Sequence, residues 1–154
     1  MDYDAIALEL HKQYKGKITT ALRDTGVIDK ARLSAYYTPG VAAVSRAIAA
    51  DETLLPVYTW TNNLVAVISD GSAVLGLGDI GPKGSMPVME GKALLFKHFA
   101  DIDSIPIVLD VHTPDEIVSV VRAIAPSFGA INLEDIAAPK CFEIEERLKA
   151  ELAI

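Results

Sequence analysis

Cysteine is nearly absent from this sequence: Cys141 is the single one among 154 residues. An intramolecular disulfide and a cysteine-cluster metal site are therefore excluded, and a cytoplasmic location is expected because thiols stay reduced there. Basic residues are also fewer than acidic ones, and the net charge is −7. We therefore expect no nucleic-acid partner, whereas a small anionic substrate needs only a few well-placed positive groups.

Long hydrophobic runs are missing as well. No apolar stretch approaches the roughly 18 residues needed to cross a bilayer, and the acidic N-terminus lacks the basic and apolar regions of a signal peptide. We therefore expect no membrane partner. The composition, 51% hydrophobic and 23% charged, is typical of one compact α/β domain and excludes a disordered tail.

The pattern of apolar residues predicts alternating strands and helices. Three short runs predict buried strands, and a helical pattern follows each of them. The predicted strands are 65–69, 105–109 and 130–133, and the predicted helices are 4–14, 41–50, 89–100, 113–125 and 141–152. This order predicts an α/β fold with a small, mainly parallel sheet and flanking helices.

Acidic residues follow each predicted strand, where parallel sheets bind their ligands: Asp70, Asp110, and the pair Glu134 and Asp135. Successive residues of a strand point to opposite faces, so this last pair can hold one ion only if the backbone turns. A turn is expected because the apolar run stops at Leu133. Two carboxylates there suit Mg²⁺ or Mn²⁺, although on spacing alone solvated loop acids are the more common case.

Residues 70–91 hold six of the ten glycines, which predicts a long and functional loop. Gly76, Gly78 and Gly81 match the dinucleotide fingerprint G-x-G-x-x-G. A true fingerprint opens a helix at once, so that the pyrophosphate meets the helix N-terminus. Pro82 and the proline five residues later are expected to delay the helix. We therefore expect these glycines to let the backbone approach a ligand or strand closely, with a dinucleotide site as the alternative.

Two residues are candidates for proton transfer. Tyr37 precedes Thr38-Pro39, which is predicted to cap a helix, and the positive end of that helix would favour a phenolate. Lys92 lies at the border of an apolar stripe, where a partly desolvated lysine can act as a general base. Tyr36 and Lys97 compete equally for these roles. A packed tyrosine and a solvated lysine are the more common cases.

The order of these segments resembles that of the malic enzyme motifs. The similar segments are 37–42 (tyrosine motif), 69–82 (glycine-rich motif), 87–96 (lysine motif) and 131–136 (metal motif). Together they span about residues 35–140. Residues 1–154 thus resemble the N-terminal, substrate- and metal-side domain of a short bacterial malic enzyme, with the C-terminal NAD(P)-binding domain absent.

The resemblance implies oxidative decarboxylation of (S)-malate to pyruvate and CO2 by a homodimer, with NAD or NADP and with Mg²⁺ or Mn²⁺. Lys92 would take the proton of the C2 hydroxyl, and Tyr37 would protonate C3 of enolpyruvate. Glu134 and Asp135 would hold the metal, and the fingerprint glycines would lie near substrate or cofactor.

Two features depart from the larger malic enzymes. Ala73 replaces an arginine that binds the malate carboxylate, as fits the short bacterial branch. The third metal ligand, an aspartate, and the domain that binds most of the NAD(P) would lie beyond residue 154, so the fragment alone is expected to be inactive. The alternatives are a non-catalytic binding or dimerisation domain, a malolactic-type variant, and a small nucleotide-binding protein that uses residues 76–81.

Overall fold

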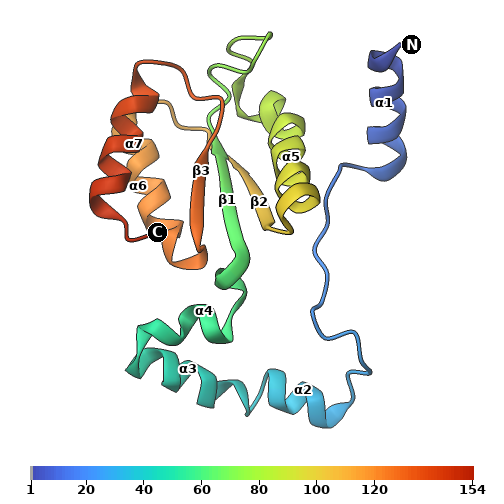
Figure 1. The fold of residues 1–154 in the computed structure, drawn as a ribbon, viewed down its shortest axis with the longest axis vertical. Helices are drawn as coiled ribbons and strands as arrows, with labels where there is room; N and C mark the ends of the chain where they lie inside the picture. Colours follow the sequence, from blue (N-terminus) through green and yellow to red (C-terminus); the bar gives the residue numbers. More distant parts are fainter. Residues whose placement is uncertain (1) are drawn as a thin grey trace. The chain divides into compact units, whose positions relative to one another are not determined.

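The structure, a computed structural model, describes residues 2–154, which form two compact units. The first comprises residues 2–18 and 63–154, and the second comprises residues 19–62. Figure 1 shows the elements of both in the colours of the sequence.

The first unit is built on a three-stranded parallel sheet in the order β2-β1-β3. Its strands are β1 (Leu64–Ser69), β2 (Asp103–Val108) and β3 (Ala130–Leu133), and its helices are α1 (Tyr3–Tyr14), α5 (Gly81–Ala100), α6 (Pro114–Ile124) and α7 (Lys140–Glu151). A short 3₁₀ helix, Ala125–Ser127, ends α6. The predicted α/β class, parallel sheet and flanking helices are confirmed.

The helices cover both faces of this sheet. Helix α5 lies against one face, and α6 and α7 lie against the other (Figure 1). Strand β1 therefore leads into α5 on one face, whereas β3 leads into α7 on the opposite face. The carboxyl ends of β1 and β3 are thus a topological switch point, the position where open α/β sheets bind their ligands.

The hydrophobic core lies between β1 and the pair α6 and α7. Alternate residues of β1 point to this side, and α6 and α7 contribute residues spaced by one helical turn. The buried residues of the cluster are Leu64, Ala66, Ile68, Leu109, Ile117, Val118, Val121, Phe128, Ile136, Ile144 and Leu148. On the other side of β1, Met89 and Ala93 give α5 a buried stripe one turn apart. Because β1 is buried on both faces, its carboxyl end, where the polar residues lie, is held in a fixed position.

The start of α5 differs from the prediction. The helix begins at Gly81 rather than at residue 89, with Pro82 in its first turn and Pro87 inside it. Pro82 is tolerated because the N–H groups of a first helical turn need no intrahelical partner. Pro87 removes one hydrogen bond of the helix without ending it. The expectation that these prolines delay the helix was therefore wrong.

The second unit is helical. It contains α2 (Lys30–Tyr36), α3 (Val41–Ala50) and α4 (Leu55–Tyr58), with a 3₁₀ turn at Glu52–Leu54. A second 3₁₀ turn, Trp60–Asn63, ends on the first residue of the returning first unit. The predicted helix 41–50 is confirmed, but its cap is not: Gly40 is the N-cap, and no side chain among the described residues caps the helix. Thr38 and Pro39 instead form a turn around a cis peptide bond. No helix within residues 2–154 has the length and apolar character needed to span a membrane.

Candidate active site

The turn expected after β3 is present. The Glu134 N–H donates to the carbonyl of Ile68 at 2.8 Å, which extends the pairing with β1 by one residue. Asp135 then adopts the left-handed conformation, with φ 51°, and its carbonyl accepts the Ala73 N–H at 3.1 Å. Aspartate tolerates this conformation better than most residues, and the reversal releases Asp135 from the strand alternation. The chain therefore meets the condition for two adjacent carboxylates to serve one ion.

The structure brings Lys92 and Glu134 together at this edge. The Lys92 Nζ lies 3.1 Å from Glu134 Oε2, and their side chains are 32% and 23% exposed. The Asn132 side-chain amide donates to the same oxygen at 3.0 Å. Lys97 pairs instead with Asp101 at 2.6 Å and with Asp103 at 2.9 Å. Of the two candidate lysines, Lys92 therefore lies at the switch point.

Asp135 has a buried carboxylate oxygen, Oδ2, that has no hydrogen-bond partner within residues 2–154. Burial raises the pKa of this carboxyl above its ordinary value, and the charge of Glu134 raises it further, against a smaller opposite effect of Lys92. A bound cation would satisfy the unpaired oxygen and offset the repulsion. The two carboxylates thus fit a hard divalent ion such as Mg²⁺ or Mn²⁺.

Glu134 and Asp135 do not complete a metal site alone. Across residues 2–154, no three or more histidine, cysteine, aspartate or glutamate side chains are grouped so that they could hold an ion. Two carboxylates leave most positions of a six-coordinate ion to substrate, water or other ligands.

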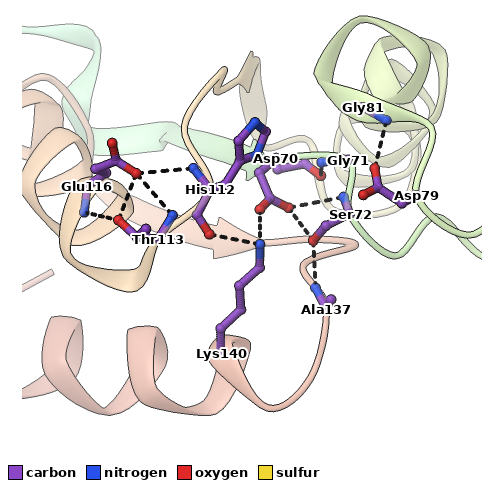
Figure 2. Close-up of polar contacts among 11 residues, drawn as sticks. Asp70, Gly71, Ser72, Asp79, Gly81, His112, Thr113, Glu116, Ala137 and Lys140 are labelled. Carbon is purple, nitrogen blue, oxygen red and sulfur yellow. Dashed lines mark hydrogen bonds and ion pairs between the residues drawn. The ribbon is translucent and has the colours of Figure 1, made fainter.

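Asp70, which directly follows β1, lies at the centre of a hydrogen-bonded network (Figure 2). Asp70, 1% exposed, accepts hydrogen bonds at Oδ1 from the Ser72 N–H at 3.1 Å and from the Ser72 hydroxyl at 2.6 Å. Its other oxygen accepts from Lys140 Nζ at 2.5 Å. Burial acts to raise the pKa of Asp70, but the hydrogen bonds from Lys140 and Ser72 outweigh it and lower that pKa. Asp70 is therefore held as a charged carboxylate in the interior.

The same network reaches the other two strand ends. The Ser72 Oγ accepts the Ala137 N–H at 2.9 Å, and Lys140 Nζ also donates to the carbonyl of His112 at 3.1 Å (Figure 2). The loop after His112 is fixed by the predicted capping box of α6, in which Thr113 and Glu116 exchange hydrogen bonds. The apolar pattern predicts Asp70 at a strand end, but its pairing with Lys140 could not be predicted, because nothing in a single sequence relates residues so far apart.

The glycine loop has two distinct parts. Gly76 and Gly78 have φ 77° and 75° in a tight turn closed by paired hydrogen bonds between Val74 and Gly78. The second part leads into α5, where the Gly81 N–H donates to the Asp79 carboxylate at 3.2 Å. A carboxylate at the start of α5 competes with a phosphate for the positive end of the helix. Binding of cofactor by these three glycines stays a prediction.

Tyr37 belongs to the second unit, and its convergence with Lys92 stays a prediction. It caps the C-terminal end of α2 instead of starting α3, and its side chain is exposed. The expected effect of a positive helix end therefore does not apply, because a helix C-terminus carries the opposite partial charge. Tyr36 donates its hydroxyl to Asp24 at 2.7 Å, and this hydrogen bond raises the pKa of Tyr36. Within residues 19–62 the Tyr37 hydroxyl makes no hydrogen bond, so of the two tyrosines it is the more available.

Comparisons with known proteins identify the family of the chain. The family profile described as "Malic enzyme, N-terminal domain" matches residues 15–149. The chain belongs to the malic enzyme family. It is 63% identical over 122 residues to the NAD-dependent malic enzyme of Geobacillus stearothermophilus, and 51% identical over 148 residues to the bifunctional malic/malolactic enzyme of Bacillus subtilis. These alignments cover 79% and 96% of this chain.

The solved structures extend the likeness to the fold. The NAD-dependent malic enzyme of Thermotoga maritima matches with a TM-score of 0.93 and 59% identity over 96% of this chain. The chain spans 26% of the Geobacillus protein, 36% of the Bacillus protein and 39% of the Thermotoga chain. The similarity thus covers a malic enzyme N-terminal domain, and the relatives continue well beyond it.

Proposed function

We propose that this chain is the substrate- and metal-side part of an enzyme that converts (S)-malate to pyruvate and CO2 with NAD or NADP. The observation that carries the proposal is the 3.1 Å approach of Lys92 to Glu134, whose neighbour Asp135 has a buried oxygen without a hydrogen-bond partner among residues 2–154. Relatives are named as NAD-dependent and as NADP-dependent, so the family leaves the choice of dinucleotide open. We also propose that a second domain, which in longer relatives would follow this one, binds most of the dinucleotide.

Each candidate residue has a proposed role that suits the chemistry of its side chain. Lys92 would take the proton of the C2 hydroxyl, and a bound oxidised dinucleotide would supply the acceptor for the C2 hydride. Glu134 and Asp135 would hold Mg²⁺ or Mn²⁺, which when bound would supply Lewis-acid stabilisation of negative charge on the substrate oxygen. Tyr37 donates a proton to C3 of the enolpyruvate, which gives pyruvate.

Supplying the remainder of the enzyme tests this proposal. The 154-residue chain is compared with a completed enzyme, in which the chain is joined to the C-terminal portion of the Geobacillus relative. With malate, NAD⁺ and Mn²⁺, we expect NADH and pyruvate from the completed enzyme and neither from the chain alone. Glu134→Gln should abolish turnover and weaken Mn²⁺ binding. Turnover by the chain alone, or a Glu134→Gln variant as active as the parent, would contradict the proposal.

A malolactic reaction is the second candidate, because one relative is named a bifunctional malic/malolactic enzyme. It would yield lactate and CO2 from malate without net accumulation of NADH. Measuring lactate, pyruvate and NADH in the same assay separates the two reactions.

A non-catalytic binding domain and a nucleotide-binding protein are further alternatives. The first predicts that the completed enzyme neither turns over malate nor binds Mn²⁺ at Glu134. The second predicts that the chain alone binds NAD⁺ through residues 76–81. The Asp79 carboxylate accepts the Gly81 N–H, and this disfavours a phosphate or a pyrophosphate at that position.

We further propose that the enzyme is a cytoplasmic homodimer. A dimer is supported by large apolar side chains left exposed within the first unit, among them Leu8 at 75% and Phe99 at 78%. A cytoplasmic location is supported by the free thiol of Cys141. Sedimentation of the completed enzyme as a monomer at micromolar concentration would contradict the dimer.

A further inference from the structure

Three contacts tie the segment that follows Glu134 to the end of β1. The Ala73 N–H donates to the carbonyl of Asp135 at 3.1 Å, and the Ala137 N–H donates to Ser72 Oγ at 2.9 Å. Lys140 then reaches Asp70 at 2.5 Å. The segment from Asp135 to Lys140 is thus attached at its beginning, middle and end to residues 70–73.

Asp70 is the centre of these contacts. Its side chain is fully buried, and both of its oxygens accept hydrogen bonds. The Ser72 hydroxyl has one proton and gives it to Asp70, so its oxygen is left to accept the Ala137 N–H. The charge of Asp70 therefore sets the direction of the chain of hydrogen bonds that ends on the backbone two residues after Asp135.

Lys140 keeps this centre in place. It is the cation that pairs with Asp70, it is only 21% exposed, and it also binds the carbonyl of His112 in the loop after β2. The conformation that these contacts hold is unfavourable, because Asp135 has φ 51°. Such a backbone persists only where its surroundings over-determine it. Without Lys140, the buried carboxylate of Asp70 would lose its cationic partner, and the segment from Asp135 to Lys140 would lose the attachment at its end.

We propose that Lys140 is a positioning residue: through Asp70 and Ser72 it fixes the turn that orients Glu134 and Asp135, and so sets the affinity of the site for a divalent cation. The inference rests on the proposed function, which places the cation at these two carboxylates. Lys140 itself, as a cation paired with Asp70, is not a metal ligand.

The test measures the binding of Mn²⁺ alone to the completed enzyme, by electron paramagnetic resonance of the free ion. Lys140→Met should weaken Mn²⁺ binding by about 10–100-fold, the usual effect of removing a residue that orients a ligand. Lys140→Arg should retain most of the affinity, because it keeps the charge and a comparable reach. Lys149→Met, on the exposed side of the same helix, removes only the surface pair with Glu145 and should leave Mn²⁺ affinity unchanged.

A second pair of variants separates positioning from stability. Lys140→Met combined with Asp70→Asn leaves no unpaired buried charge, and Ser72→Ala breaks the same chain without changing any charge. Both should bind Mn²⁺ more weakly at temperatures well below their melting points by circular dichroism. If these folded variants bind Mn²⁺ as the parent does, or if Lys149→Met weakens binding as much as Lys140→Met, the positioning role is wrong. If Glu134→Gln leaves Mn²⁺ affinity unchanged, the cation site of the proposed function is wrong, and this inference falls with it.

Discussion

Lys92 and Glu134, which approach from α5 and from the end of β3, form an ion pair in which Nζ lies 3.1 Å from Oε2. A candidate base is thus paired with a candidate metal ligand. The pairing has a chemical consequence, because a cation that engages Glu134 competes with Lys92 for the same carboxylate.

Replacing each of the two neighbouring lysines tests the assignment of the base. In the completed enzyme, Lys92→Ala should lower kcat by about 10²–10⁴-fold, the usual contribution of a general base. Lys97→Ala is the control, because Lys97 forms ion pairs with Asp101 and Asp103 instead. Steady-state rates of NADH formation decide the outcome, and equal, small effects of both substitutions would show that Lys92 is not the base.

The Asp135 carboxylate should destabilise the metal-free fold, although it is needed to bind the metal. Its carboxyl is partly buried, one oxygen has no hydrogen-bond partner in the described part of the chain, and its pKa is raised by burial and by Glu134. An acid whose folded-state pKa is raised destabilises the fold at pH values above that pKa. Asp135→Asn should therefore raise the melting temperature of the metal-free chain at neutral pH.

The same substitution should abolish the rise in melting temperature that Mn²⁺ gives the parent. Thermal melts with and without Mn²⁺ measure both effects. Asp110→Asn is the control, because Asp110 also follows a strand of the sheet but is exposed. A metal-free Asp135→Asn variant that melts below the parent would contradict the expected cost of this carboxylate.

The sequence predicted several strands and helices of both units well, because these elements have strong local signals. Strand 130–133 and helix 41–50 agree with the structure residue by residue, and Thr113 with Glu116 forms the expected capping box. The start of α5 was missed because the free-energy cost of a proline in a helix is an average, and this helix accommodates its prolines. Residues 51–63 were not predicted to form helical turns, because the helical segments there are too short for a periodic pattern of apolar residues to be recognised.

The candidate site was predictable only in part. Local composition identified the carboxylates at the strand ends and the two lysines, and the motif resemblance pointed to Lys92. The spatial choice between Lys92 and Lys97 depends on which face of α5 packs on β1. The pairing of Asp70 with Lys140 joins two loops distant in sequence, so it needed the topology of the sheet.

Gly71 and Gly76 of the glycine loop should respond differently to substitution by alanine. Both have positive φ, which costs an L-residue about 1–2 kcal/mol. At Gly71, however, an added Cβ would also overlap the backbone carbonyl of Gly81, whereas at Gly76 it would meet open space. Gly71→Ala should therefore lower the free energy of unfolding clearly more than Gly76→Ala does. Urea unfolding of both variants measures the difference, and equal losses would mean that the loop shifts to accept the methyl group.

Acid should destabilise the chain partly through Asp70. Burial acts to raise the pKa of this carboxyl, but the hydrogen bonds from Lys140 and Ser72 outweigh it, so the folded-state pKa lies below the ordinary 3.8. The unfolded chain then binds the proton more readily than the folded chain. The stabilisation from Asp70 is complete above the ordinary pKa and is lost as the pH falls through the lower folded-state value.

Asp70→Asn removes this titration and should flatten the loss of stability below about pH 4. The measurement is the free energy of unfolding in urea for the parent and the variant, from about pH 7 down to about pH 2.5, followed by far-ultraviolet circular dichroism. Asp101→Asn is the control: hydrogen bonding to Lys97 lowers the pKa of Asp101 too, but Asp101 is exposed, so its pair contributes little. The two variants should differ most in acid, where the Asp101→Asn curve follows the parent. If the Asp70→Asn curve runs parallel to that of the parent through the whole range, Asp70 does not carry the buried charge that orders this end of the sheet.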